Sequence, residues 1–223
     1  YLAVIIALLA MQLPKFIKPE KKISAIHTLR EGLSYTRRHP AIRILLFILA
    51  FSSLIGIGFL TLIPAWAVEV LNGGPTINGL LQSARGIGSL ITAFSIAALG
   101  SIHYKGRLLT FGSFFFPVML IGWSLITSVS LSLLFMIGIG IGFMLLITMV
   151  NTLVQTLVDE RMRGRVSALY TLSFMGMMPV GSLLIGLAAD RFGEPMTVLI
   201  SGIIFLSTAA LLYWKAPHIR ALE

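Results

Sequence analysis

The chain has 223 residues, of which 57% are hydrophobic and 11% are charged. Soluble domains carry about 25% charged residues, so this composition excludes a soluble globular domain and predicts a protein embedded in the lipid bilayer. The formal net charge of +9 is spread over separate loops, which argues against nucleic acid as a partner. Cysteine is absent, which excludes disulfides and thiolate metal sites.

The apolar run at residues 1–13, YLAVIIALLAMQL, opens the chain. A helix needs about 20 residues to cross the hydrocarbon core, so this run is too short to span it. It lacks an initiator methionine, a basic start and a small-residue cleavage site, so a signal peptide is not expected. We expect the truncated end of a preceding transmembrane helix, and therefore a C-terminal fragment.

Residues 14–43 form a basic segment that we expect to be a cytoplasmic linker. Within it, Ile26, Leu29 and Leu33 recur at helical spacing, with arginines on the other faces. This pattern predicts an amphipathic helix on the inner membrane surface. The alternative is a plain solvated connector.

Six apolar segments follow, each about as long as a membrane-crossing helix. Two of them contain an internal proline, which transmembrane helices tolerate when neighbouring groups satisfy the freed carbonyl. A short tail at residues 215–223 closes the chain. The predicted spans are residues 44–63, 77–99, 108–127, 131–153, 166–189 and 196–214.

The basic residues set the predicted orientation. All but Arg85 and Arg191 of the 17 lysines and arginines fall in alternate loops or in the tail, on one side of the membrane. Cytoplasmic loops carry the excess of basic residues in membrane proteins. We therefore expect that side, including the C-terminus, to be cytoplasmic.

A polar stripe runs along the predicted second span. Its members follow one another at steps of 4, 3, 4 and 3, which places them on one helical face. Polar groups in lipid are unfavourable unless they face protein or water, so we expect this face to line a substrate path. The alternative is that the central arginine pairs with a carbonyl or an acid and only fixes packing. The stripe consists of Asn78, Gln82, Arg85, Ser89 and Thr92.

A second polar group occupies the cytoplasmic ends of the predicted fourth and fifth spans, and we expect it to line the same path. Its members are Thr148, Asn151, Gln155 and Tyr170. The commoner role of a single membrane threonine is a bond to its own helix.

The loop between these two spans, DERMRGR, mixes acids with arginines. We expect its charges to pair with one another, or to cap the next helix, and to act as a conformational latch. The alternative is a set of solvated charges that only fixes topology. The residues are Asp159, Glu160, Arg161, Arg163 and Arg165.

Two similar stretches, IGIGFLTLIPAW at 55–66 and IGIGFMLLITMV at 139–150, indicate an internal repeat of about 85 residues. GSIHYKG from Gly100 and GLAADRF from Gly186 lie at nearly the same offset. Such a repeat contains three spans, and an odd number inverts the second copy across the membrane, as in secondary transporters. Chance similarity of glycine-rich runs is the alternative.

The stretches LREGLSYTRRHPAIR, LLQSARGIGSLI, NTLVQTLVDERMRGRVSALY and GSLLIGLAADRFG resemble the C-terminal half of a major facilitator superfamily transporter. The resemblance is narrowest to the drug and siderophore exporter branch that includes the enterobactin exporter. It implies an all-α bundle of two inverted three-helix repeats, a missing N-terminal six-helix half, a small-molecule substrate and a bacterial inner membrane.

The same resemblance implies that the first, second, fourth and fifth spans face inward and the third and sixth outward. The loop signature of the family is intact at one place, and Tyr104 replaces its acid at the other. The intact copy, a second conformational loop, consists of Gly186, Asp190, Arg191 and Gly193.

Enzyme motifs are absent from the sequence. The four histidines lie in loops, and neither H-E-x-x-H nor a phosphate-binding loop occurs. No catalytic residue, cofactor or metal is therefore predicted. No acid lies deep in a span, so coupling to protons would depend on the missing half. The predicted function is export of small hydrophobic or amphipathic molecules by alternating access; the alternative is a membrane scaffold or receptor without transport.

Overall fold

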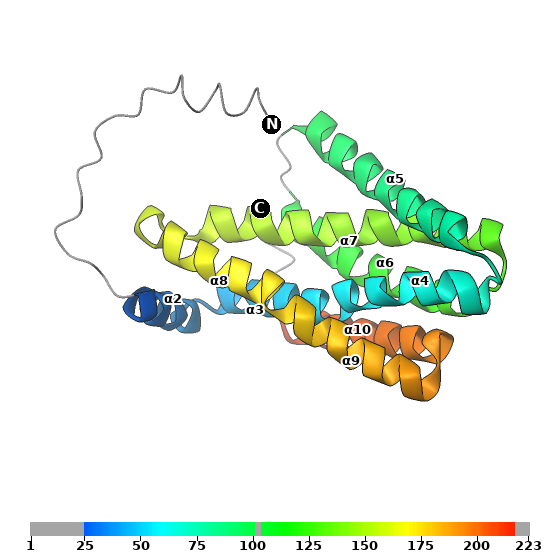
Figure 1. The fold of residues 1–223 in the computed structure, drawn as a ribbon. Coiled ribbons are helices and arrows are strands. Elements are labelled where there is room, and N and C mark those ends of the chain that lie inside the picture. Colours follow the sequence, from blue (N-terminus) through cyan, green and yellow to red (C-terminus); the bar gives the residue numbers. More distant parts are fainter. Residues whose placement is uncertain (1–24, 101–103, 217–223) are drawn as a thin grey trace, which may run out of the picture.

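The computed structural model describes residues 25–100 and 104–216 (Figure 1). The predicted helix end at 1–13, linker residues 14–24 and tail residues 217–223 lie outside these ranges. Within the described part of the chain, every regular element is a helix. The predicted all-α fold is confirmed.

Helix α2 (Ala25–Arg38) precedes the membrane segments. The predicted linker contains this helix, but the linker ends earlier than residue 43 because the next helix begins at Pro40. Proline suits the first turn of a helix, where its missing N–H has no intrahelical partner. His39 accordingly adopts an extended conformation between the two helices.

The first span is one continuous rod from Pro40 to Val70, and not the shorter segment 44–63 that the sequence predicts. Pro64 does not end it, because the backbone around it already departs from regular α-helix geometry. The rod consists of α3 (Pro40–Phe51), the π-helix η1 (Ser52–Ile57), the 3₁₀-helix η2 (Gly58–Leu62), α4 (Ile63–Ala65) and the π-helix η3 (Trp66–Val70).

The predicted fifth span, 166–189, lies inside one segment, Glu160–Phe192, that is long and apolar enough to cross a membrane, and this segment is interrupted at Gly176. Helix α8 ends at Met175, α9 begins at Met177, and Gly176 lies between them. Pro179 follows within one turn, and its missing N–H cannot hydrogen-bond to α8. The remaining elements are α5 (Pro75–Leu99), α6 (Lys105–Ser124), α7 (Val129–Leu157), the 3₁₀-helix η4 (Glu160–Met162), α8 (Arg163–Met175), α9 (Met177–Phe192) and α10 (Glu194–Lys215).

Five helical segments of the described chain are long and apolar enough to cross a membrane. Helix α5, the predicted second span, has 25 residues but is not among the five. Its polar residues Asn78, Gln82 and Arg85 lower its mean hydropathy. Its place across the membrane therefore stays a prediction.

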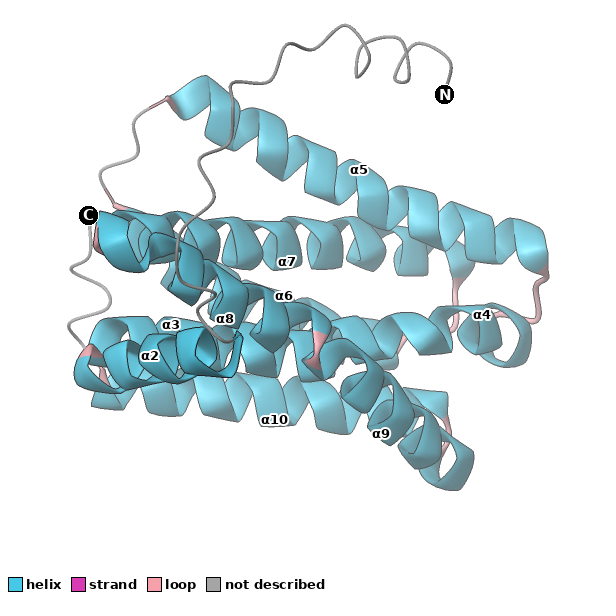
Figure 2. Cartoon of the chain, turned by 60° about the vertical axis from the view of Figure 1, so that its left-hand side comes forward, coloured by secondary structure: helices cyan, strands magenta, loops and turns pink. Residues whose placement is uncertain are grey.

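Helix α7 holds one side of the bundle together, since α5 packs along it and α6 packs along it as well (Figure 2). Helix α10 lies against α6, and α9 crosses the first span at η1 and η2. The core between the first span and α6 is aromatic, with Trp66 stacked on Trp123 at a ring-centroid distance of 4.1 Å. This arrangement leaves α5 attached mainly to a single neighbour.

Candidate functional site

Helix α5 approaches α7 so closely that two glycines are required. A Cβ atom on Gly88 would collide with the carbonyl oxygen of Ile137, and a Cβ atom on Gly140 would collide with the carbonyl oxygen of Arg85. Small residues allow such backbone contact between membrane helices. The contact fixes the backbone of α5 at the level of Arg85.

The polar stripe of α5 divides at this contact. Ser89 donates from Oγ toward Arg85 O at 3.2 Å and Gly140 O at 3.4 Å. Thr92 is buried, and its Oγ1 lies 3.2 Å from both Gly88 O and Ile141 O. Ser89 and Thr92 therefore tie α5 to α7.

The other half of the stripe has unsatisfied polar atoms. Arg85 Nε and Asn78 Oδ1 are buried and make no hydrogen bond with any described residue. Gln82 is half-buried and lies between them on the same face. These three residues are the part of the stripe that remains available to a ligand.

The second polar group lies elsewhere on α7. Gln155 donates to Asn151 Oδ1, and Asn151 interacts with the Tyr170 hydroxyl of α8. Thr148 accepts at its backbone oxygen from Thr152, at 2.9 Å. Asn151 follows Gly140, the neighbour of Arg85, by three helical turns, or about 16 Å along the helix. The two predicted polar groups therefore do not form one cluster.

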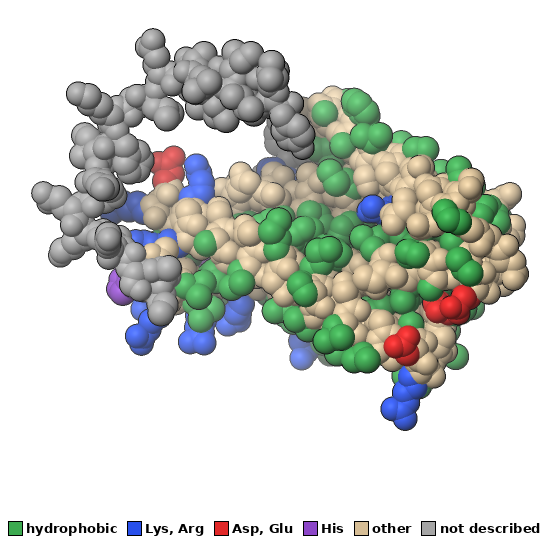
Figure 3. All heavy atoms as spheres, in the orientation of Figure 1, with side chains coloured by type: hydrophobic (Ala, Val, Ile, Leu, Met, Phe, Trp, Pro, Cys, Tyr) green, Lys and Arg blue, Asp and Glu red, His purple; other side chains and the backbone are tan. Residues whose placement is uncertain are grey.

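The end of the bundle that carries α2 and residues 158–165, called here the basic end, gathers lysine and arginine side chains (Figure 3). Arg165 pairs with Glu31 of α2 at 3.0 Å. The Tyr35 hydroxyl donates to Asp159 Oδ2 at 3.0 Å and accepts from the Asp159 backbone N–H at 3.3 Å. Helix α2 is thus docked on the DERMRGR loop.

This docking corrects the predicted pairing within the loop. Among the described residues, no ion pair joins Asp159 or Glu160 to Arg161, Arg163 or Arg165, and Asp159 makes no side-chain cap. The acid that Arg165 contacts comes instead from a helix far away in the sequence. The sequence did not identify Glu31 and Tyr35 as partners of this loop, although their spacing of four residues places both on one face of α2.

Of the four residues predicted as a second conformational loop, only Gly193 lies in the turn between α9 and α10, and the other three lie inside α9. Gly193 has a φ of +78°, a left-handed conformation that suits glycine, and ends α9. Arg191 lies 5.9 Å from the centroid of the Phe192 ring, and Asp190 is exposed. Gly186 has no atom close to its Cβ position. Gly193 thus shapes the turn.

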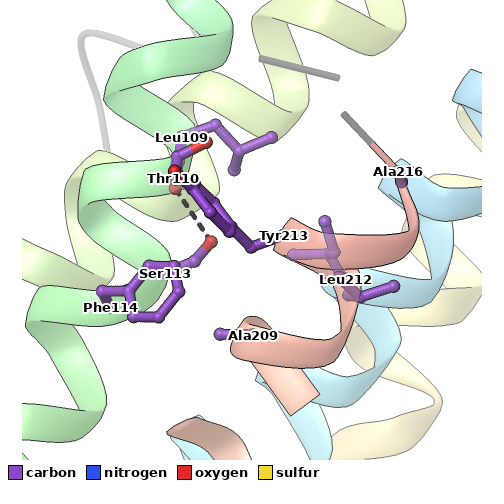
Figure 4. Close-up of a pocket in the computed structure, with 9 residues that line it drawn as sticks. Leu109, Thr110, Ser113, Phe114, Ala209, Leu212, Tyr213 and Ala216 are labelled. Atoms are coloured by element: carbon purple, nitrogen blue, oxygen red, sulfur yellow. Dashed lines mark hydrogen bonds between the residues drawn. The ribbon is translucent and has the colours of Figure 1, made fainter. Parts of the chain in front are cut away.

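Two cavities lie away from these residues. Figure 4 shows one of about 40 Å³ between α6 and α10, where Ser113 donates to Leu109 O at 2.8 Å. An apolar crevice of about 330 Å³ lies between the first span, α9 and α10. Neither is lined by a residue predicted to form the substrate path, so that role stays a prediction.

A family model described as transmembrane secretion effector, of the major facilitator superfamily, matches residues 1–223. The chain belongs to this family. The predicted superfamily is therefore confirmed.

A crystal structure of a glutamate-to-glutamine mutant of the peptide transporter POT, in complex with alafosfalin, has a similar fold, with a TM-score of 0.63 and 15% identity. The match covers 82% of this chain and 40% of that chain, so this chain spans less than half of its structural neighbour. At this identity the likeness shows the fold alone. No curated protein matches the sequence significantly.

Proposed function

We propose that this transporter exports small hydrophobic or amphipathic molecules across a bacterial inner membrane by alternating access, together with an N-terminal six-helix half. The observation that carries the proposal is the pair of buried, unsatisfied polar atoms on α5, Arg85 Nε and Asn78 Oδ1. A polar group in such surroundings is retained where a ligand or a water-filled path satisfies it. Acids are absent from the middle of the described spans, so any proton carrier belongs to the other half.

Counterflow of a lipophilic dye through proteoliposomes that contain the full-length protein tests the transport function. We expect Arg85→Ala to lower the initial rate about tenfold or more, because a hydrogen bond to a charged group contributes about 1.5–3 kcal/mol. Arg43→Ala is the matched control, since Arg43 is an exposed arginine near the start of the first span and belongs to none of the predicted sites. Equal rates for the wild type and the two variants would show that Arg85 does not line the path. No flux in any of the three would favour a scaffold.

We also propose that α2 and residues 158–165 form the conformational latch. The contacts between Glu31 and Arg165 and between Tyr35 and Asp159 support it, because a switch needs an interaction that holds one state and breaks in the other. The latch would hold the half in its outward-open state.

Charge reversal tests the latch. We expect Glu31→Arg or Arg165→Glu alone to widen the distance distribution between spin labels on α2 and on the loop, and the double reversal to restore it. The pair is only partly exposed, with side-chain exposures of 38% and 29%, and such pairs contribute about 1 kcal/mol, or roughly a fivefold population change. Arg107→Glu, an exposed change in the first turn of α6 and outside the latch, is the control, and a distribution altered equally by that change would contradict the latch.

A further inference from the structure

We infer that α5 selects a substrate that carries an anionic group and, about 10 Å away, a second hydrogen-bonding group. Arg85 binds the anion, and the Asn78 amide binds the second group. This inference rests on the transport function proposed above and names the substrate class of the same site.

The first step is that Arg85 needs a partner. Its Nε is buried, and the side chain makes no hydrogen bond or ion pair within the described ranges. The side chain as a whole is half-buried, and a charged group held partly out of water without a partner is unfavourable. A guanidinium presents a rigid fork of donors that matches a carboxylate or phosphate, so the missing partner is an anion.

The second step is that the described part of the chain does not supply this anion. Each of its acids lies in α2, in a loop or at an end of a spanning segment, and Figure 3 shows acidic side chains at the two ends of the face in view. Two of these acids already bind the partners described above. The acids are Glu31, Glu69, Asp159, Glu160, Asp190 and Glu194.

The third step is that the protein fixes the base of the Arg85 side chain. The backbone carbonyl oxygen of Arg85 lies against Gly140 and accepts a hydrogen bond from Ser89, whose hydroxyl also reaches Gly140 O. A backbone held in this way keeps the point from which the Arg85 side chain extends at a fixed position beside α7.

The fourth step concerns the length of the ligand. Asn78 Oδ1 is also buried without a partner. Asn78 lies seven positions before Arg85, which corresponds to about 10 Å along an α-helix, and Gln82 lies between them. An elongated amphipathic acid can reach both groups at once.

The test compares (dansylamino)octanoate, whose sulfonamide and carboxylate are about that far apart, with its uncharged carboxamide, in proteoliposomes of the full-length protein. We expect the wild type to transport the acid about tenfold faster than the amide. Arg85→Gln removes this preference, and Arg85→Lys restores part of it because the charge returns. Asn78→Ala slows the acid and leaves dansylglycine, which is too short to reach both residues, unchanged. Ser83→Ala, an exposed change on the same helix, alters the transport rate of neither the acid nor dansylglycine.

Several results would overturn the inference. If Arg85→Gln slows the acid and the amide equally, the arginine pairs with an acid of the protein itself. If the wild type transports an uncharged dye but shows no preference for the acid, the transport function stands and the anion site fails. If no compound moves, both fail.

Discussion

We expect Gly88→Ala to destabilise the transporter more than an alanine substitution normally does. The new Cβ atom would collide with the backbone oxygen of Ile137, and a backbone cannot turn aside as a flexible side chain can. Overpacking costs typically about 1–3 kcal/mol, and a backbone collision belongs at the upper end of that range. Thermal unfolding followed by tryptophan fluorescence should show a midpoint lower by roughly 5 °C or more.

Gly86→Ala is the matched control on the same helix. Nothing lies within 4 Å of its Cβ position, and replacing glycine in a helix stabilises it by about 0.4–1 kcal/mol. The two substitutions should therefore shift the midpoint in opposite directions. Equal midpoints for both variants would mean that α5 does not contact α7 at Gly88.

The second large effect is expected at Gly181, where α9 crosses the first span. A Cβ atom there would collide with the carbonyl oxygen of Leu54 in η1. Close by, the buried Ser53 donates to the Phe174 oxygen of α8, so a displaced α9 also strains this bond. We expect Gly181→Ala to lower the unfolding midpoint as far as Gly88→Ala does and to abolish transport.

Gly186→Ala separates this effect from a general intolerance of α9 to substitution. Gly186 belongs to the loop signature, but no atom lies within 4 Å of its Cβ position. Its variant should fold and transport normally. Loss of folding in both variants would show that the crossing at Leu54 is not what limits α9.

The sequence predicts the helices better than their irregularities. Apolar runs of about 20 residues locate membrane helices because lipid imposes one length on all of them. The irregular turns η1 and η2 of the first span pack against α9, and hydrophobic periodicity does not encode such contacts. Helix α5 shows the reverse case. Its polar residues lower its mean hydropathy, yet the same residues are the ones that predict its role in the substrate path.

The stripe on α5 was visible in the sequence, but its division was not. Helical spacing places Asn78, Arg85 and Thr92 on one face, whichever neighbour that face meets. The structure ties Thr92 to α7 and leaves the side chains of Asn78 and Arg85 without partners among the described residues. The difference arises because the backbone contact with α7 lies at Gly88, one turn from Thr92 but ten positions from Asn78.

The partners in the DERMRGR loop could not be predicted, because Tyr35 and Asp159 are 124 residues apart. Loop charges close in sequence are the natural first candidates, yet Arg165, in the first turn of α8, pairs with Glu31 of α2 instead. The amphipathic pattern of α2 identifies the apolar face of this helix. It does not identify the protein surface that the polar face contacts.

The glycine contact between α5 and α7 also limits how this half can move. Ser89 and Thr92 also bridge the two helices where their backbones touch, so we expect α5 and α7 to move as one unit. The interruptions of regular helix lie elsewhere, in the first span and at Gly176 between α8 and α9. We therefore expect this half to bend in those two segments, with Arg85 keeping its place beside Gly140.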